Sequence, residues 1–251
     1  MLQRDIMGGL AKGLLAIETF TADRPRQSVS QVAAASGLDR ATARRCLLTL
    51  SYLGYADYDG KFFTLTPRVL RLGTACLATM PLPQVVQPHL DRLSQEIGES
   101  SSASILDDAE IVYVARAAQR KVMSIALMPG SRLPAFCTSM GRVLLAALPV
   151  EEAQRRLGAL PLAARTNRTI TDVALILEQL DAVRRTCYAV IDQEVEIGLR
   201  SIAVPVLNSR GATVAAMNVG VSATHADLDD LVSSYLAPML RVQSELRALL
   251  R

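Results

Sequence analysis

Three arginines crowd the start of one short segment, where their side chains could bind a polyanion. The segment reads GLDRATARRCLLTL and contains Arg40, Arg44 and Arg45, with Thr42 between them. A guanidinium group donates two parallel hydrogen bonds to a phosphate or to the edge of guanine, and a hydroxyl can bind phosphate. These residue types suit contact with nucleic acid, provided that one helix presents them on an open face.

The apolar residues of the same segment predict such a helix. Ala43, Cys46, Leu47 and Leu50 recur at positions i, i+3, i+4 and i+7, which is the spacing of a buried helical stripe. The stripe turns the arginines and Thr42 toward the open side. Asp39 is suited to cap the first turn of this helix.

The preceding residues predict the other half of a helix-turn-helix. A first amphipathic helix is expected over residues 10–21, followed by a break at DRPRQS. Ser30 is suited to cap a short helix that ends at Ala35, after which Ser36 and Gly37 supply a tight corner.

The segment GYADYDGKFFTLTP then predicts a β-hairpin. Its two β-prone runs flank Asp59 and Gly60, a dipeptide that favours a type I′ turn. A hairpin directly after a helix-turn-helix is a wing, and it places Lys61 at the tip, near phosphate or the minor groove. We therefore expect a winged helix-turn-helix domain over residues 1–66.

The arginines have two interpretations. As a DNA-reading surface, Arg40, Thr42 and Arg45 would meet bases or the groove, and Arg44 would bind phosphate. As a solvated helix face, they would leave a small-ligand sensor or scaffold without sequence-specific DNA binding. Their position at the start of the second helix, followed by a wing, favours the first interpretation.

Composition and charge limit the class of protein. Half of the 251 residues are hydrophobic, yet the longest apolar runs are too short to cross a bilayer, so we expect a cytoplasmic protein with no membrane partner. The net charge of +3 is uneven: residues 1–80 hold ten basic and six acidic side chains, and residues 81–251 hold seventeen and eighteen. The basic excess coincides with the module expected to bind a polyanion.

Catalytic, metal and cofactor sites are not predicted. The four cysteines form no CxxC pair, and the two histidines, His89 and His225, lie apart from them in sequence. Cys137 has no evident base that would make it a nucleophile, so we expect it to be buried or to line a pocket. Phosphate-binding glycine loops are absent from the sequence.

The rest of the chain predicts a linker helix over residues 67–82 and a mixed domain over residues 83–251. The overall fold class is α+β, with an antiparallel sheet flanked by helices. Strands are expected at 101–107, 110–117, 121–128, 188–206 and 213–222, and helices at 85–98, 140–158, 172–186 and 228–249.

Five ordered segments resemble the IclR-type transcriptional regulators along essentially the whole chain. They are DIMGGLAKGLLAIE, GLDRATARRCLLTLSYLGY, LTPRVLRLG, RLPAFCTSMGRVLLAAL and GLRSIAVPV. They look most like the branch that controls protocatechuate, 4-hydroxybenzoate and β-ketoadipate catabolism. The resemblance implies a winged helix-turn-helix, a GAF-like effector-binding domain, double-stranded operator DNA as partner, and homodimers that often pair into tetramers. It does not distinguish activation from repression.

The resemblance also implies an effector pocket. Its residues map to Thr138, Ser139, Met140, Gly141, Leu199, Ser201, Asn218 and Gly220. Free amides at the start of the helix in FCTSMGRVLLAAL could bind a carboxylate without a charged side chain. Met140 and Leu199 could enclose an aromatic ring, while Ser201 and Asn218 bond a ring substituent or a second carboxylate. The expected effector is a small organic acid, either an aromatic acid or a β-ketoadipate-like acid.

Three further residues near this pocket bear on these expectations. Ile191 stands where the family usually has a polar or acidic residue, so we expect a more apolar pocket wall that favours a ring over glyoxylate. Arg200 lies between Leu199 and Ser201 on a presumed strand, and alternation points it to the opposite face, where its role would be structural. Glu194 is retained from the family pattern.

Overall fold

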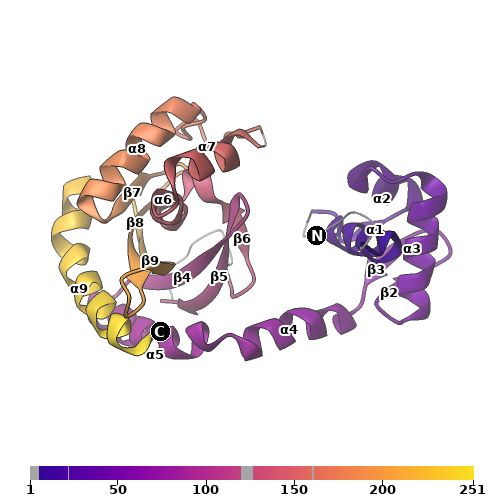
Figure 1. Cartoon of the computed structure of the whole chain (residues 1–251), viewed down its shortest axis with the longest axis horizontal. Coiled ribbons are helices and arrows are strands. Elements are labelled where there is room, and N and C mark those ends of the chain that lie inside the picture. The colour runs from indigo at the N-terminus through magenta and orange to yellow at the C-terminus, as the bar shows by residue number, and fades with distance from the viewer. Residues whose placement is uncertain (1–5, 22, 120–126, 160) are drawn as a thin grey trace. The chain divides into compact units, whose positions relative to one another are not determined.

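The computed structural model describes residues 6–21, 23–119, 127–159 and 161–251 (Figure 1). The chain divides into two compact units, Met1–Thr79 and Met80–Arg251, and each has a hydrophobic core of its own. None of the described helices is both long enough and apolar enough to cross a membrane.

The N-terminal unit packs three helices against a small sheet. The helices are α1 (Gly8–Glu18), α2 (Val29–Ser36) and α3 (Arg40–Tyr52), and the strands are β1 (Arg26–Gln27), β2 (Ala56–Tyr58) and β3 (Phe63–Leu65). The antiparallel strand order is β1-β3-β2, so β1 adds a strand that the sequence did not predict. A short 3-10 turn at Pro67–Val69 leads into α4 (Leu70–Thr79).

The helix-turn-helix corner confirms most of the sequence prediction. Gly37 ends α2 with a φ of 69°, a left-handed conformation that glycine adopts without strain. Asp39 caps α3, because its carboxylate accepts a 2.9 Å hydrogen bond from the amide of Thr42. Ser30 was the wrong cap for α2. Ser28 takes that place, since Gln31 completes a reciprocal capping box with it.

The wing is present, but the prediction of a type I′ turn was wrong. Pairing ends at Tyr58 and Phe63, so four residues connect the strands. The Asp59 carboxylate accepts from the amides of Lys61 (2.9 Å) and Phe62 (2.8 Å), and this side-chain capping replaces the tight two-residue turn. These amide bonds, with Arg26, lower the pKa of Asp59 to about 2.

The C-terminal unit is built on a six-stranded antiparallel sheet with helices on both faces (Figure 1). In the order β6-β5-β4-β9-β8-β7, its strands are β6 (Arg132–Pro134), β5 (Glu110–Ala117), β4 (Ser100–Asp107), β9 (Thr213–Ser222), β8 (Leu199–Leu207) and β7 (Ala189–Asp192). Helices α5 (Pro81–Ile97) and α9 (Leu228–Leu249) cover one face. The other face carries α6 (Ser139–Ala146), α7 (Val150–Gly158) and α8 (Val173–Thr186).

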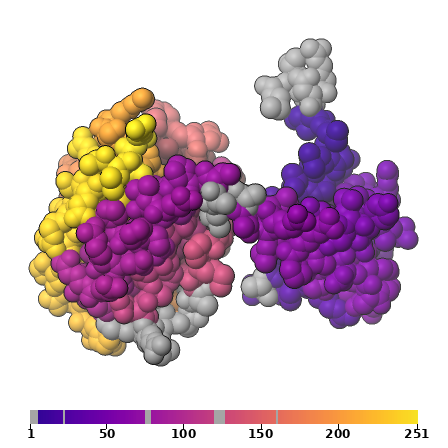
Figure 2. All heavy atoms as spheres, turned by 90° about the horizontal axis from the view of Figure 1, so that it is seen from below, coloured from indigo at the N-terminus to yellow at the C-terminus, as the bar shows by residue number. Residues whose placement is uncertain are grey.

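The two helices on the first face lie side by side, as the space-filling view shows (Figure 2). Arg92 of α5 forms a 2.5 Å ion pair with Glu245 of α9, and Arg241 of α9 pairs with Glu96 of α5. The predicted bounds of α9 are confirmed at both ends. This packing covers one face of the sheet, so side chains that contact a ligand would have to lie on the other face.

Some predicted elements differ in extent. The helix expected over 140–158 is two helices, because Pro149 stops α6 and starts α7. The strand expected over 188–206 is the hairpin of β7 and β8. Most of the strand expected over 121–128 lies outside the described residues.

Strand alternation sorts side chains between the two faces of the sheet. On β8, Leu199 and Ser201 face the side of α6, while Ile202 belongs to the core under α5 and α9. Arg200 points away from Leu199, where it pairs with Asp192 at 2.7 Å and donates to the carbonyl of Ala226, which confirms its structural role.

Candidate functional site

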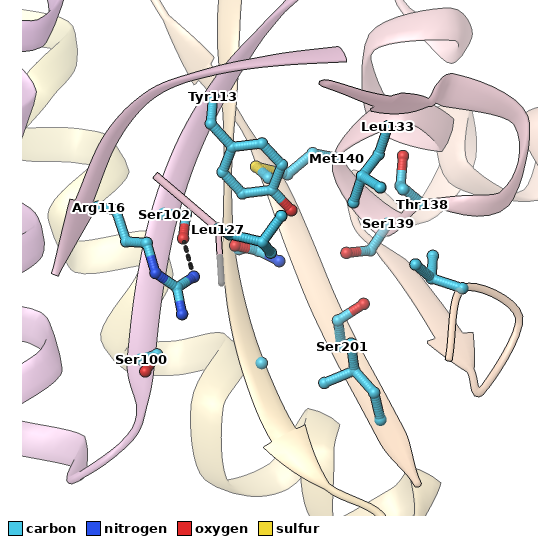
Figure 3. Close-up of a pocket in the computed structure, with 14 residues that line it drawn as sticks. Ser100, Ser102, Tyr113, Arg116, Leu127, Leu133, Thr138, Ser139, Met140 and Ser201 are labelled. Atoms are coloured by element: carbon cyan, nitrogen blue, oxygen red, sulfur yellow. Dashed lines mark hydrogen bonds between the residues drawn. The ribbon is translucent and has the colours of Figure 1, made fainter. Parts of the chain in front are cut away.

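A small cavity of about 30 Å³ lies on the α6 side of the six-stranded sheet (Figure 3). Seven of the eight effector residues expected from the sequence line it: Thr138, Ser139, Met140, Leu199, Ser201, Asn218 and Gly220. The other lining residues are Ser100, Ser102, Tyr113, Arg116, Leu127, Leu133 and Val195. The volume is that of roughly two waters, so a larger ligand must displace side chains as it enters.

Gly141 does not line the cavity. Its amide donates to the Thr138 hydroxyl at 3.1 Å, so this helix-start donor is already used. A Cβ at Gly141 would lie 2.1 Å from the carbonyl oxygen of Ala135. Glycine at this position lets α6 pack directly against the loop that carries Thr138.

Replacing Gly141 with alanine is expected to lower the free energy of unfolding by about 1–3 kcal/mol, because backbone must shift to admit the methyl group. Urea unfolding followed by circular dichroism measures the loss. Gly158→Ala is the matched control, since no atom lies within 4 Å of its added Cβ. A loss no greater than that of the control would contradict the close packing.

The start of α6 offers one unpaired hydroxyl to the cavity. Thr138 caps the helix, and the Ser139 side chain points into the pocket (Figure 3). Ser139 is only 1% exposed, yet its hydroxyl has no hydrogen-bond partner among the described residues. A buried hydroxyl without a partner is costly unless a ligand or water satisfies it.

Arg116 provides a cation that the sequence analysis missed. It is half-buried on β5, and its guanidinium donates a 3.0 Å hydrogen bond to the Ser102 hydroxyl. Gln87 bonds both the amide and the carbonyl of Arg116, which fixes the strand at that point. Burial lowers the pKa of Arg116 from its ordinary value, but a guanidinium stays protonated in neutral solution. Of the described lining residues, Arg116 alone is charged.

A β-bulge explains how Arg116 reaches the pocket. Tyr113 pairs with Ser104 and Ala115 pairs with Ala103, so Val114 is an extra residue in β5. Val114 and Ala115 consequently both join the core under α5 and α9. The interruption brings Tyr113 and Arg116 to the same face, whereas strict alternation would separate them.

The pocket walls combine apolar surface with a neutral phenol. Burial raises the pKa of Tyr113 to about 12, so its hydroxyl remains protonated at neutral pH. Met140 is held by a 3.2 Å contact in which the Ser104 hydroxyl donates to its sulfur. Ile191, which was expected in the wall, is instead buried in register with Ser201 and does not line the cavity.

An ion pair lies buried beneath α6. Arg142, on α6, contacts Glu194 at 3.1 Å, and it also donates to the Phe136 carbonyl and to Gln179. Glu194 in turn accepts from the amide of Ile170 at 3.1 Å. This network ties the loop before α6 to the turn between β7 and β8, and both segments carry pocket residues.

Cys137 is fully buried beside this network, as the sequence predicted. Burial raises the pKa of its thiol to about 11, with Glu194 acting in the same direction. A thiol that stays protonated at neutral pH is a weak nucleophile.

The arginines of α3 lie on its open side. Arg40, Arg44 and Arg45 are exposed, and none forms an ion pair with any residue that the structure describes. Thr42 is half-buried. Lys61 is exposed at the wing, with its ammonium 5.2 Å from the centre of the Phe62 ring.

Arg26 supports the wing from β1. It forms a 2.5 Å ion pair with Asp59 and lies 4.1 Å above the centre of the Phe62 ring. The sequence did not predict this contact, because its pattern indicates a break between helices where β1 lies. Arg26 therefore helps to place the loop that carries Lys61.

Comparison with known proteins identifies both units. Residues 9–60 match the family model of the IclR helix-turn-helix domain, and residues 74–245 match that of the bacterial transcriptional regulator IclR C-terminal domain. The chain is 40% identical to the Pca regulon regulatory protein of Pseudomonas putida, over 96% of this chain and 84% of that protein.

Two further relatives support the same assignment. The p-hydroxybenzoate hydroxylase transcriptional activator of Acinetobacter baylyi is 40% identical, over 98% of this chain and 92% of its own length. A crystal structure of a double mutant of the PobR inducer-binding domain from Acinetobacter, in complex with 3-hydroxybenzoic acid, is 36% identical with a TM-score of 0.64. That match covers 67% of this chain and 98% of the other. The chain belongs to the IclR family of transcriptional regulators.

Proposed function

We propose that this regulator controls genes of aromatic-acid catabolism, and that a small aromatic acid bound in the C-terminal pocket alters its action on operator DNA. The observation that carries the proposal is the pocket itself, which joins one half-buried arginine, an unpartnered serine hydroxyl and apolar walls. Ligand pockets typically combine apolar surface with a few polar groups that fix orientation. The names of the relatives support the same class of effector.

We assign the parts of the chain within the bounds that the sequence predicts. Residues 1–66 form the winged DNA-binding domain, residues 67–82 the linker, whose helix is α4 (Leu70–Thr79), and residues 83–251 the effector domain. The effector residues are the seven predicted positions that line the cavity, with Arg116 and Ser102 added from the structure. Gly141 supports the pocket without contacting its space. The protein carries out no catalysis in this proposal and acts on DNA in the cytoplasm.

The N-terminal unit supports the proposal on the DNA side. Its exposed arginines on α3 are free to contact phosphates and bases, with Arg40, Thr42 and Arg45 toward bases, Arg44 toward phosphate and Lys61 at the wing. This freedom favours DNA binding over the alternative of a sensor without sequence-specific DNA binding.

A homodimer is part of the proposal. An apolar groove of about 660 Å³ lies within the N-terminal unit, and its lining includes Leu10 (61% exposed), Leu14, Leu53 and Leu72. Exposed apolar patches often mark sites of interaction, and a second copy of the chain would cover this groove. Dimers of helix-turn-helix proteins also bind two half-sites at once. Sedimentation of the full chain measures the oligomeric state, including any tetramer.

The effector need only prefer one arrangement of the DNA-binding units by a few kcal/mol to change operator occupancy tenfold or more. The linker helix is the element through which we expect this coupling to pass. Transcription from the operator, measured with and without the effector, distinguishes activation from repression.

Thermal unfolding of the full chain against a panel of acids tests the proposed effector class. A ligand that binds only the folded state raises the unfolding midpoint. We expect 4-hydroxybenzoate or protocatechuate to raise it, and glyoxylate, pyruvate and an uncharged phenol to leave it unchanged. A rise with glyoxylate or pyruvate alone would contradict the proposal of an aromatic acid.

A further inference from the structure

We infer that the effector spans the pocket with its single carboxylate on Arg116 and a neutral hydroxyl at Ser139, which makes it a phenolic monocarboxylate and not a dicarboxylate. The inference rests on the proposed function and specifies the ligand of that same site. It follows from how charge and hydrogen-bonding capacity are distributed along the cavity.

The first observation is the separation of the polar groups. Figure 3 shows Arg116 with Ser102 at one side of the pocket and Thr138 with Ser139 at the other. Tyr113 lies between them, and together with Met140 it forms a wall suited to a ring. A rigid ring with polar substituents at opposite ends matches this arrangement.

The second observation is the charge. Arg116 is the one charged side chain among the described residues that line the cavity. Arg142 belongs to α6, but its guanidinium pairs with the carboxylate of Glu194 at 3.1 Å, so Arg142 supplies no free cation to the Ser139 end. A buried carboxylate is costly unless a cation pairs with it, so the pocket can compensate one carboxylate and not two.

The third observation is the unsatisfied hydroxyl of Ser139. It is fully buried and has no partner among the described residues, and a hydroxyl can both donate and accept. A phenolic hydroxyl meets both capacities without bringing a second charge. A ligand without this group would leave the Ser139 hydroxyl unpaired.

The opposite orientation, with the carboxylate at the start of α6 and the hydroxyl at Arg116, satisfies fewer of the pocket's polar groups. A carboxylate at the start of α6, the position expected from the sequence, would rely on neutral donors alone, and Thr138 already takes the Gly141 amide. That orientation would also leave the guanidinium of Arg116 without an anion. Charge-assisted hydrogen bonds are about twice as strong as neutral ones, so the carboxylate belongs at Arg116.

Titration calorimetry of the full chain tests this orientation, with 4-hydroxybenzoate, benzoate, 4-hydroxybenzamide and β-ketoadipate as probes. We expect 4-hydroxybenzoate to bind most tightly. Arg116→Gln is expected to weaken its binding about 10- to 100-fold, the effect of losing a charge-assisted bond. Arg116→Lys should retain more affinity than Arg116→Gln. Arg185→Gln is the matched control, because Arg185 is exposed on α8 and does not line the pocket.

Ser139→Ala tests the other end. It should weaken 4-hydroxybenzoate while leaving benzoate unchanged, because benzoate lacks the hydroxyl that Ser139 would bind. If Arg116→Gln does not fold, 4-hydroxybenzamide tests the same contact in the unaltered protein, since a neutral amide replaces its carboxylate. Its affinity should fall about as far as that caused by the substitution.

The outcomes separate the two proposals. If 4-hydroxybenzoate binds but its affinity is indifferent to Arg116→Gln and to Ser139→Ala, the aromatic effector stands and the orientation is overturned. If β-ketoadipate binds more tightly than the monocarboxylates, the charge argument is overturned. If no probe binds the unaltered protein, the proposed effector class and this inference both fall.

Discussion

Arg45→Ala is expected to lower affinity for the operator about 10- to 100-fold and to reduce discrimination between operator and unrelated DNA. Arg45 is exposed on the open side of α3, where a guanidinium can bind a guanine edge with two hydrogen bonds. A good contact of this kind discriminates by about 1–3 kcal/mol. Fluorescence anisotropy with DNA from upstream of the protein's own gene, compared with a scrambled duplex, measures both quantities.

Arg44→Ala is the informative comparison, because we assign Arg44 to phosphate. It should weaken binding to both duplexes alike. It should also reduce the slope of log affinity against log salt concentration by about one. Arg45 also borders the apolar groove assigned to the dimer, so sedimentation of Arg45→Ala must show an unchanged oligomeric state. Operator affinity equal to that of the unaltered protein would instead support a sensor without sequence-specific DNA binding.

Periodicity predicted the parts of the fold that depend on burial. The stripe from Ala43 to Leu50 placed the arginines correctly, because packing against the other helices leaves only one face of α3 open. Alternation on β8 likewise separated Arg200 from Ser201. Those residues are positioned by regular helical or strand geometry, which a single sequence reveals.

The missed features depend on local irregularities. Arg116 reaches the pocket because Val114 interrupts the alternation of β5, and nothing in the strand's composition marks that bulge. The wing turn depends on the Asp59 carboxylate, which accepts hydrogen bonds from two amides of the loop. These bonds replace the two-residue turn that the Asp-Gly dipeptide favours. Ser102, in contrast, could have been found, because alternate serines of SSSAS face the pocket once β4 is recognised.

The neutral and the charged residues of the pocket differ in the regularity of the elements that carry them. Ser139 and Leu199, two positions that the resemblance mapped to the pocket, line the cavity from a regular helix start and a regular strand. The cation comes from the irregular strand. The sequence therefore indicated the neutral half of the pocket and missed the charged half, to which we assign the carboxylate of the effector.

Arg142→Met is expected to lower the free energy of unfolding by about 3–5 kcal/mol, because it leaves the carboxylate of Glu194 buried without its cation. The two side chains are only 1% and 6% exposed, so water cannot replace the lost partner. Urea unfolding of the full chain measures the loss. Arg168→Met is the matched control: Arg168 pairs with Asp192 at the surface and is 51% exposed, so its loss should be at most about 1 kcal/mol.

The loss should also depend on pH with a defined sign. Burial raises the pKa of Glu194 above its ordinary value, although Arg142 opposes the rise, so removing Arg142 raises that pKa further. A carboxyl whose pKa is raised by folding destabilises the fold as pH rises above its unfolded pKa, and the penalty is relieved as pH falls through the folded pKa. The deficit of Arg142→Met should therefore be smaller at pH 5 than at pH 7.5.

A second substitution distinguishes an unpaired charge from lost packing. In Arg142→Met with Glu194→Met no charge is buried, so the double variant should be more stable than Arg142→Met alone at pH 7.5. If the single and the double variant lose the same free energy of unfolding, and neither loss changes with pH, Arg142 acts through its contacts with Phe136 and Gln179. It then does not act through Glu194. If the pair acts as inferred, effector affinity should fall in the same order as stability. The pair joins the loop before Ser139 to the turn that carries Val195 and leads into Leu199.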